Sequence, residues 1–95
     1  MRDRTGTVTV NDAPTKSKLY RFCEKKIDQW IESRAADESK DVPIEFKVSF
    51  IEEDETRQVS CETEIRVQGH LWTGADLGSD EQQAFLQCLK RLHPH

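Results

Sequence analysis

Two adjacent runs in the middle of the chain alternate strictly between apolar and polar residues. The first has its apolar phase at Ile44, Phe46, Val48 and Phe50, and the second has its inner phase at Val59, Cys61, Thr63, Ile65 and Val67. A period of two with one apolar face is typical of a half-buried strand. The polar segment 52–56 joins the runs, so the pattern predicts an antiparallel hairpin with one buried face.

The charges on the outer face of this hairpin indicate its register. One register places Glu45 opposite Arg66 and Lys47 opposite Glu64, and the alternative places Glu45 opposite Glu64. Like charges directly opposite each other destabilise a strand pair, whereas opposite charges stabilise it. We therefore expect the first register.

Two segments, about residues 17–36 and 79–92, change to the period of a helix. The apolar stripe of the first is Leu19, Tyr20, Cys23, Ile27, Trp30 and Ile31, and that of the second is Phe85, Cys88, Leu89 and Leu92. Ser79 is the expected N-cap of the second helix, and Gln82 completes a capping box. Residues 36–41 form the loop after the first helix.

Weaker strand signals lie at both ends of this core pattern. Residues 5–10 are β-prone and end in Asn11 and Asp12, so 1–14 form an edge strand or a flexible N-terminus. Residues 70–73 predict a short third strand, and 74–78 a loop. The order (β)-α-β-β-β-α predicts a single α+β domain over 1–95. We expect a two-layer sandwich whose three- or four-stranded antiparallel sheet carries two helices on one face.

Composition and charge limit the classes of function that the chain can have. Apolar residues make up 35% of the chain and charged residues 34%, with a net charge of -4. Residues 1–40 carry a balance of +2 and residues 41–95 a balance of -6, which argues against a nucleic-acid surface in the second part. The widely spaced Cys23, Cys61 and Cys88 indicate reduced, buried thiols, and no long apolar run occurs. We expect a cytoplasmic protein that does not enter a membrane.

The candidate interaction residues are Lys18, Arg21, Lys25 and Trp72. The three cations lie within about 60° of one another on the first helix, opposite its apolar stripe. They either contact RNA or an acidic partner, or form a solvated face paired with nearby carboxylates. Trp72 either anchors a protein interface from the solvent side of the sheet or closes the edge of the core.

No residue pattern predicts catalysis, a cofactor or a metal site. The acidic run Glu52–Glu55 lacks the glycine and oxygen spacing of a calcium loop and fits a solvated hairpin tip. Cys61 and His70 form no nucleophile–base pair in the pattern, because Cys61 shares the inner face of its strand. No phosphate-binding or hydrolase motif occurs. We therefore expect no enzyme.

The element order from Leu19 to Leu92 resembles that of the double-stranded RNA-binding fold. Residues 43–46 and 59–69 are similar to its strand sequences. That family implies a Gly-Pro-x-His loop between the first two strands and a Lys-Lys-x-x-Lys start to the last helix. Here those positions read Glu52–Glu55 and Asp80-Glu81-Gln82-Gln83. The resemblance therefore implies the fold without its usual RNA contacts.

Residues 61–92 also resemble small uncharacterised bacterial proteins whose final helix opens G-x-D-x-x-Q-A-L. The matching residues are Gly78, Asp80, Gln83 and Ala84. This resemblance implies a bacterial origin. The sequence thus favours a non-catalytic module that binds a protein or itself. Two alternatives are a divergent RNA-binding domain that uses the basic face of the first helix, and a small-ligand binder.

Overall fold

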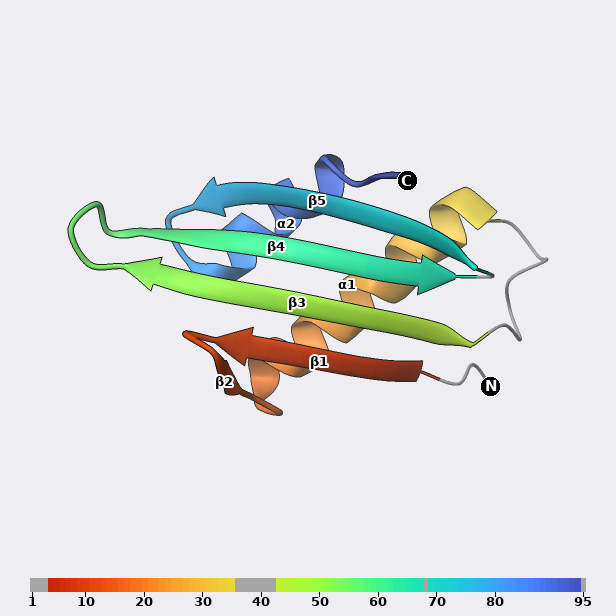
Figure 1. The fold of residues 1–95 in the computed structure, drawn as a ribbon, viewed down its shortest axis with the longest axis horizontal. Helices are drawn as coiled ribbons and strands as arrows, with labels where there is room; N and C mark the ends of the chain where they lie inside the picture. Colours follow the sequence, from red (N-terminus) through yellow and green to blue (C-terminus); the bar gives the residue numbers. More distant parts are fainter. Residues whose placement is uncertain (1–3, 36–42, 68, 95) are drawn as a thin grey trace.

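The computed structural model describes residues 4–35, 43–67 and 69–94, and within them two helices cover one face of a six-stranded sheet (Figure 1). The elements in chain order are β1 (Arg4–Val10), β2 (Ala13–Pro14), α1 (Lys18–Ala35), β3 (Ile44–Glu53), β4 (Gln58–Val67), β5 (His70–Gly78), α2 (Glu81–Lys90) and β6 (His93–Pro94). The strand order across the sheet is β2-β1-β3-β4-β5-β6. The expected α+β class and helix placement are confirmed, but the sheet is larger than the three or four strands predicted.

The central hairpin of β3 and β4 has the expected alternation and register. Glu45 lies opposite Arg66 and Lys47 opposite Glu64, as the charges on the outer face predict. Inner residues such as Phe50 and Ile65 are completely buried, while the outer face stays open to solvent. The loop predicted at 52–56 is shorter, because the strands pair as far as Glu53 and Gln58.

Within the N-terminal segment, β1 is a strand that pairs with β3 in parallel. The prediction of a purely antiparallel sheet is therefore wrong. The reason is the connection: β1 reaches β3 through the whole length of α1, and such a helical crossover joins parallel strands. The two-residue strand β2 folds back on the end of β1 through Asn11 and Asp12, which have positive φ angles of 51° and 69°. Two such residues in succession form a tight hairpin turn.

Strand β5 extends through residues 74–78, where the sequence predicted a loop. Gly74 and Gly78 lie within this strand, and the backbone of α2 packs directly on them. A Cβ atom at Gly74 would lie 3.0 Å from the carbonyl oxygen of Cys88, and one at Gly78 would lie 2.4 Å from the backbone nitrogen of Ala84. Glycine within a strand marks such a close backbone approach as readily as it marks a turn.

The core lies between the sheet and the two helices. Phe85 of α2 stands between two other rings, edge-on to Phe22 of α1 at 6.2 Å and to Phe50 of β3 at 6.4 Å between centroids. Edge-to-face contacts of this kind stabilise aromatic pairs beyond the burial of their area. The predicted apolar stripe of α2 is buried throughout. No helix in the described part of the chain is long and apolar enough to span a membrane.

The N-cap of α2 is Asp80 rather than the predicted Ser79. The side chain of Asp80 accepts a hydrogen bond from the backbone N–H of Gln83 at 2.8 Å. The side-chain oxygen of Gln83 in turn accepts from the backbone N–H of Ser79 at 2.8 Å. Gln83 thus replaces Gln82 as the partner of the cap, but it accepts from the residue before the N-cap, so the arrangement is a variant of the capping box. The loop predicted at 36–41 lies outside the described residues.

Candidate functional site

The outer side of α1 carries the basic residues that the sequence singles out. Lys18, Arg21 and Lys25 are all exposed, on the helix side turned away from the sheet. Ser17 caps the helix, since its hydroxyl accepts a hydrogen bond from the N–H of Leu19 at 3.4 Å. The structure thus gathers these three cations over the first two turns of α1.

The electrostatics of this helix start favour an anion. The first turn of α1 contains no acidic residue. Cations near a helix N-terminus lie at the positive end of the helix dipole, which costs about 0.3–1 kcal/mol of stability each. The side chains of Lys18 and Arg21 and the dipole therefore add up to one positive region. Phosphate groups are the ligands that such a region attracts.

Trp72 lies on the helix-covered side of β5. It pairs in register with the buried Ile65, and its ring meets that of Trp30 from α1 edge-on, with 5.0 Å between centroids. Both tryptophans are partly buried against the core. This position corresponds to the alternative in which Trp72 closes the edge of the core, and it lies apart from the cations at the start of α1.

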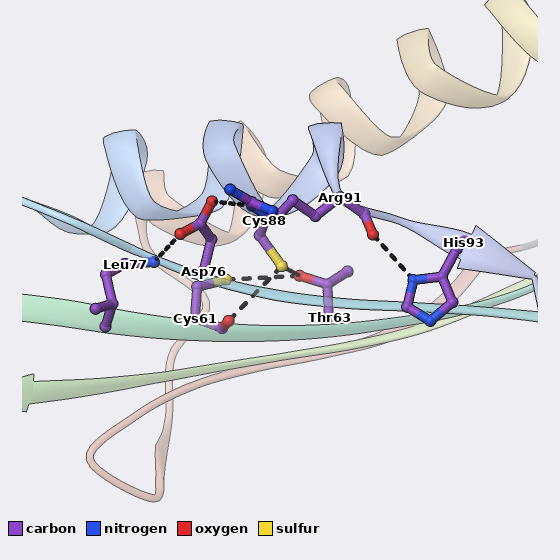
Figure 2. A network of polar contacts seen from close by, with 7 residues as sticks. All are labelled: Cys61, Thr63, Asp76, Leu77, Cys88, Arg91 and His93. Carbon is purple, nitrogen blue, oxygen red and sulfur yellow. Dashed lines mark hydrogen bonds and ion pairs between the residues drawn. The ribbon is translucent and has the colours of Figure 1, made fainter.

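Two buried thiols and a hydroxyl meet beneath α2 (Figure 2). The thiol of Cys88 donates to the hydroxyl oxygen of Thr63 at 3.2 Å, and the sulfur of Cys61 lies 3.5 Å from the same oxygen. These contacts give the Thr63 hydroxyl hydrogen-bonding partners inside an otherwise apolar layer. All three cysteines are buried, as predicted.

The pKa values of these thiols do not favour a nucleophile that reaches a substrate. Burial raises the pKa of the Cys23 thiol to about 12. The hydrogen bond to Cys88, together with burial, raises the pKa of Cys61, while the same bond lowers the pKa of Cys88. Cys88 is completely buried, so its lower pKa brings no accessible sulfur to the surface.

One end of the sheet, near the β3–β4 turn, is strongly acidic. Residues from both sides of that turn line a shallow hollow with the start of α2, among them Glu52, Glu53, Asp54, Asp80 and Glu81. A hydrogen bond with Glu52 raises the pKa of the Glu81 carboxyl. No group of three or more His, Cys, Asp or Glu residues in the described parts of the chain has the arrangement of a metal site.

Two exposed apolar residues on the uncovered face of the sheet are not among the predicted site residues. Ile51 is 39% exposed and Leu77 is 46% exposed. The alternation along the strands indicates such residues, because both fall at outward positions. For Leu77 the sequence predicts a loop over 74–78, and a loop residue has no defined face. On the opposite side of Leu77's strand, Asp76 accepts hydrogen bonds from the N–H of Leu77 and from Arg91, both of which lower its pKa (Figure 2).

The fold has clear structural relatives. It is similar to the N-terminal domain of Protein Y from Thermus thermophilus, with a TM-score of 0.68, 12% sequence identity, and alignment over 93% of this chain and 88% of that one. It is also similar to a ribosomal subunit interface protein from Coxiella burnetii, with a TM-score of 0.65, 10% identity, and alignment over 95% and 87%. No family model matches the chain, and no curated protein matches it in sequence. At these identities the likeness establishes the shared fold.

Proposed function

We propose that this chain is a non-catalytic, ribosome-associated binding domain that contacts RNA through the start of α1. The observation that carries the proposal is the fold, which matches a Protein Y N-terminal domain and a ribosomal subunit interface protein over nearly the full length of all three chains. A fold alone hosts many functions, so the surface of this chain must supply the rest of the argument.

The basic start of α1 supplies the RNA contact. Lys18, Arg21 and Lys25 are exposed and lie together at a positive helix end. Phosphate contacts of this type position a protein on RNA without reading its sequence.

The overall charge limits how this domain binds RNA. With a net charge of -4, the chain as a whole is repelled by RNA, so attraction is confined to the basic end of α1. Binding through about three phosphate contacts is salt-dependent, and it needs further contacts to reach a useful affinity. A folded ribosomal surface, which offers both RNA and protein, meets that need better than free RNA. A ribosome-bound role also agrees with the expected cytoplasmic location.

Co-sedimentation with purified bacterial ribosomal subunits tests the proposal. We expect the protein to migrate with subunits at low salt and to dissociate as salt rises. The triple variant Lys18→Gln, Arg21→Gln and Lys25→Gln should bind at least about tenfold more weakly, with a salt dependence reduced by about one unit of slope for each lost phosphate contact.

A matched control separates the basic helix from net charge. The triple variant Gln82→Glu, Gln87→Glu and Lys90→Gln changes the charge by the same amount at exposed positions of α2. It should bind much better than the α1 variant. Equal losses in both variants would refute the assignment to α1, and a wild-type protein that stays at the top of the gradient would refute ribosome association itself.

A further inference from the structure

The uncovered face of the sheet is built from rows of outward side chains that run across the strands. Register assigns one row to Ile51 of β3, Ser60 of β4 and Leu77 of β5, at the end near the β3–β4 turn. Both helices lie behind the sheet in the view of Figure 1, so no helix or strand in the described parts of the chain covers this face. Its side chains are free to meet a partner.

Two large apolar side chains stand together in that row. Ile51 and Leu77 are 39% and 46% exposed, and each lies directly beside Ser60. In the described parts of the chain, Leu86 of α2 is the other large apolar side chain exposed to this degree, at 40%, and it lies on the helix layer. One such residue on each side of Ser60 gives a partner two apolar anchors on an otherwise polar face.

The residues around this row are acidic. On the same face Glu53 and Glu62 are the nearest charged residues along their strands, and neither the row nor its neighbours on β3, β4 and β5 contain lysine or arginine. In the exposed turn Asp54 and Glu55 add two carboxylates and Arg57 adds one cation, so the turn stays net acidic. We call Ile51, Glu53, Ser60, Glu62 and Leu77 the acidic-apolar patch.

The other end of the same face differs in charge. There Glu45 opposes Arg66 and Lys47 opposes Glu64, so each carboxylate has a cation directly across the strand pair. The excess negative charge of this face, which Arg57 of the turn offsets only in part, therefore lies at the acidic-apolar patch. An interface whose apolar anchors are ringed by one sign of charge selects a partner with the opposite charge.

The strand that presents Leu77 is tied to the helix layer. The backbone N–H of Leu77 donates to the Asp76 carboxylate at 2.7 Å, and the second oxygen of that carboxylate accepts from Arg91 Nε at 2.8 Å (Figure 2). These contacts join the end of β5 to the end of α2.

We propose that the acidic-apolar patch docks a basic protein segment, whose aliphatic or aromatic side chains cover Ile51 and Leu77 while its lysines and arginines meet Glu53, Glu62 and the turn. The inference rests on the proposed function only in placing the partner on the ribosome. The protein contact that it adds lies on the face of the sheet opposite the proposed RNA-binding helix. RNA does not fit this patch, since its phosphates would face four carboxylates. A second copy of the chain would place the same negative charges against each other.

Peptide binding tests the patch without a ribosome. The probe is a synthetic amphipathic peptide of alternating lysine and leucine, and the protein is the intact chain. We expect the double variant Ile51→Ser, Leu77→Ser to bind about tenfold more weakly than wild type. The single variant Glu62→Lys reverses a charge of the patch. It should also bind the peptide more weakly than wild type, and most clearly at low salt. Leu86→Ser, which removes an equally exposed leucine from the helix layer, should bind like wild type.

The outcomes of this experiment are distinct. Equal binding by wild type and the double variant overturns the proposal, and so does an equal loss in Leu86→Ser. Self-association of wild type that the double variant abolishes also overturns it, because the patch would then be covered by a second copy. Circular dichroism verifies that each variant is folded, which the exposure of all three side chains leads us to expect.

Photo-crosslinking on ribosomal subunits provides the second test. A benzophenone amino acid at position 77 should crosslink to ribosomal protein, and one at exposed Gln29 of α1 should crosslink to RNA. RNA products from position 77, or none while Gln29 reacts, overturn the proposal. If neither position reacts because the chain does not bind subunits, the proposed function fails, and the peptide measurement still decides the role of the patch.

Discussion

Asn11 is joined to Glu52 by two hydrogen bonds that connect the β1–β2 turn to the end of β3. The side-chain amide of Asn11 donates to Glu52 Oε1 at 3.0 Å, and its carbonyl oxygen accepts from the backbone N–H of Glu52 at 2.9 Å. The backbone N–H of Asn11 also donates to the carbonyl oxygen of Phe50 at 2.8 Å. This one residue therefore makes the turn and fixes the parallel strand pair at its end.

The two roles of Asn11 are separable by substitution. Asn11→Gly keeps the positive φ of 51° and removes the side-chain hydrogen bonds, so we expect a loss of about 1 kcal/mol in the free energy of unfolding. Asn11→Ala also strains the turn and should lose about 1 kcal/mol more. Urea unfolding measures both. Equal stability of the two variants would show that the turn conformation contributes nothing.

The close packing at Gly78 means that one added methyl group should destabilise the fold strongly. A Cβ atom there would lie 2.4 Å from the backbone nitrogen of Ala84, so Gly78→Ala must push α2 away from β5. We expect a loss of about 3 kcal/mol in the free energy of unfolding, as for overpacking against a rigid backbone.

Gly69 provides the matched control for Gly78. Its φ is +77°, but a Cβ atom there would meet nothing within 4 Å. Gly69→Ala should therefore lose only about 1 kcal/mol through backbone strain. A smaller loss for Gly78→Ala than for Gly69→Ala, measured by urea unfolding, would contradict the close packing of α2 on β5.

Local pattern was enough to predict the central hairpin and both helices. The alternation of Val48 and Phe50 with polar residues sets the inner face, and the charges of Glu45 and Arg66 set the register. Pairing between distant segments was harder. Strand β1 has the same local pattern whether it pairs in parallel or antiparallel, and only the crossover through α1 decides. Gly74 and Gly78 of β5 are typical of a loop in the sequence. The sequence alone does not show that the backbone of α2 packs on them.

The surface was predictable only in part. The basic stripe of α1 follows from helical spacing, and the structure places Lys18, Arg21 and Lys25 on the exposed side. The acidic-apolar patch needs the register of three strands, since Ile51 and Leu77 are far apart in the chain and meet only through Ser60. Whether these surfaces bind RNA and protein stays a prediction for the experiments above.

Thr63 is the polar residue at the centre of the buried layer, and its hydroxyl has a definite role. It accepts from the Cys88 thiol at 3.2 Å. Thr63→Val has nearly the same shape and removes that acceptor, so we expect a loss of about 1 kcal/mol. Thr63→Ser keeps the hydroxyl but loses a methyl group, with a cavity cost of about 1 kcal/mol.

Thiol reactivity distinguishes these two variants of Thr63. The Thr63 hydroxyl lowers the pKa of Cys88, so its loss in Thr63→Val leaves less thiolate at about pH 8. Because both variants are destabilised to the same extent, Thr63→Val should react more slowly with a small disulfide reagent than Thr63→Ser. Wild type should react slowly as well, because all three thiols are buried. Similar rates for the valine and serine variants would contradict a specific role of the hydroxyl.

Glu81 makes the stability of the fold depend on pH. The hydrogen bond with Glu52 and partial burial raise the pKa of Glu81, so the folded protein holds its proton to higher pH than the unfolded chain does. The stabilisation is present below the ordinary pKa of a glutamate and is lost as pH rises through the raised value. Glu81→Gln mimics the protonated carboxyl and should raise Tm by about 2 °C at about pH 7 and leave it nearly unchanged at about pH 4.

Glu55→Gln is the control for this pH dependence, because it removes the same charge from the exposed β3–β4 turn. Differential scanning calorimetry at both pH values compares the two variants. A gain in Glu81→Gln that is equal at both pH values, or matched by Glu55→Gln, would mean that net charge alone is responsible. A gain confined to neutral pH and to position 81 would support the raised pKa of Glu81 beside Glu52.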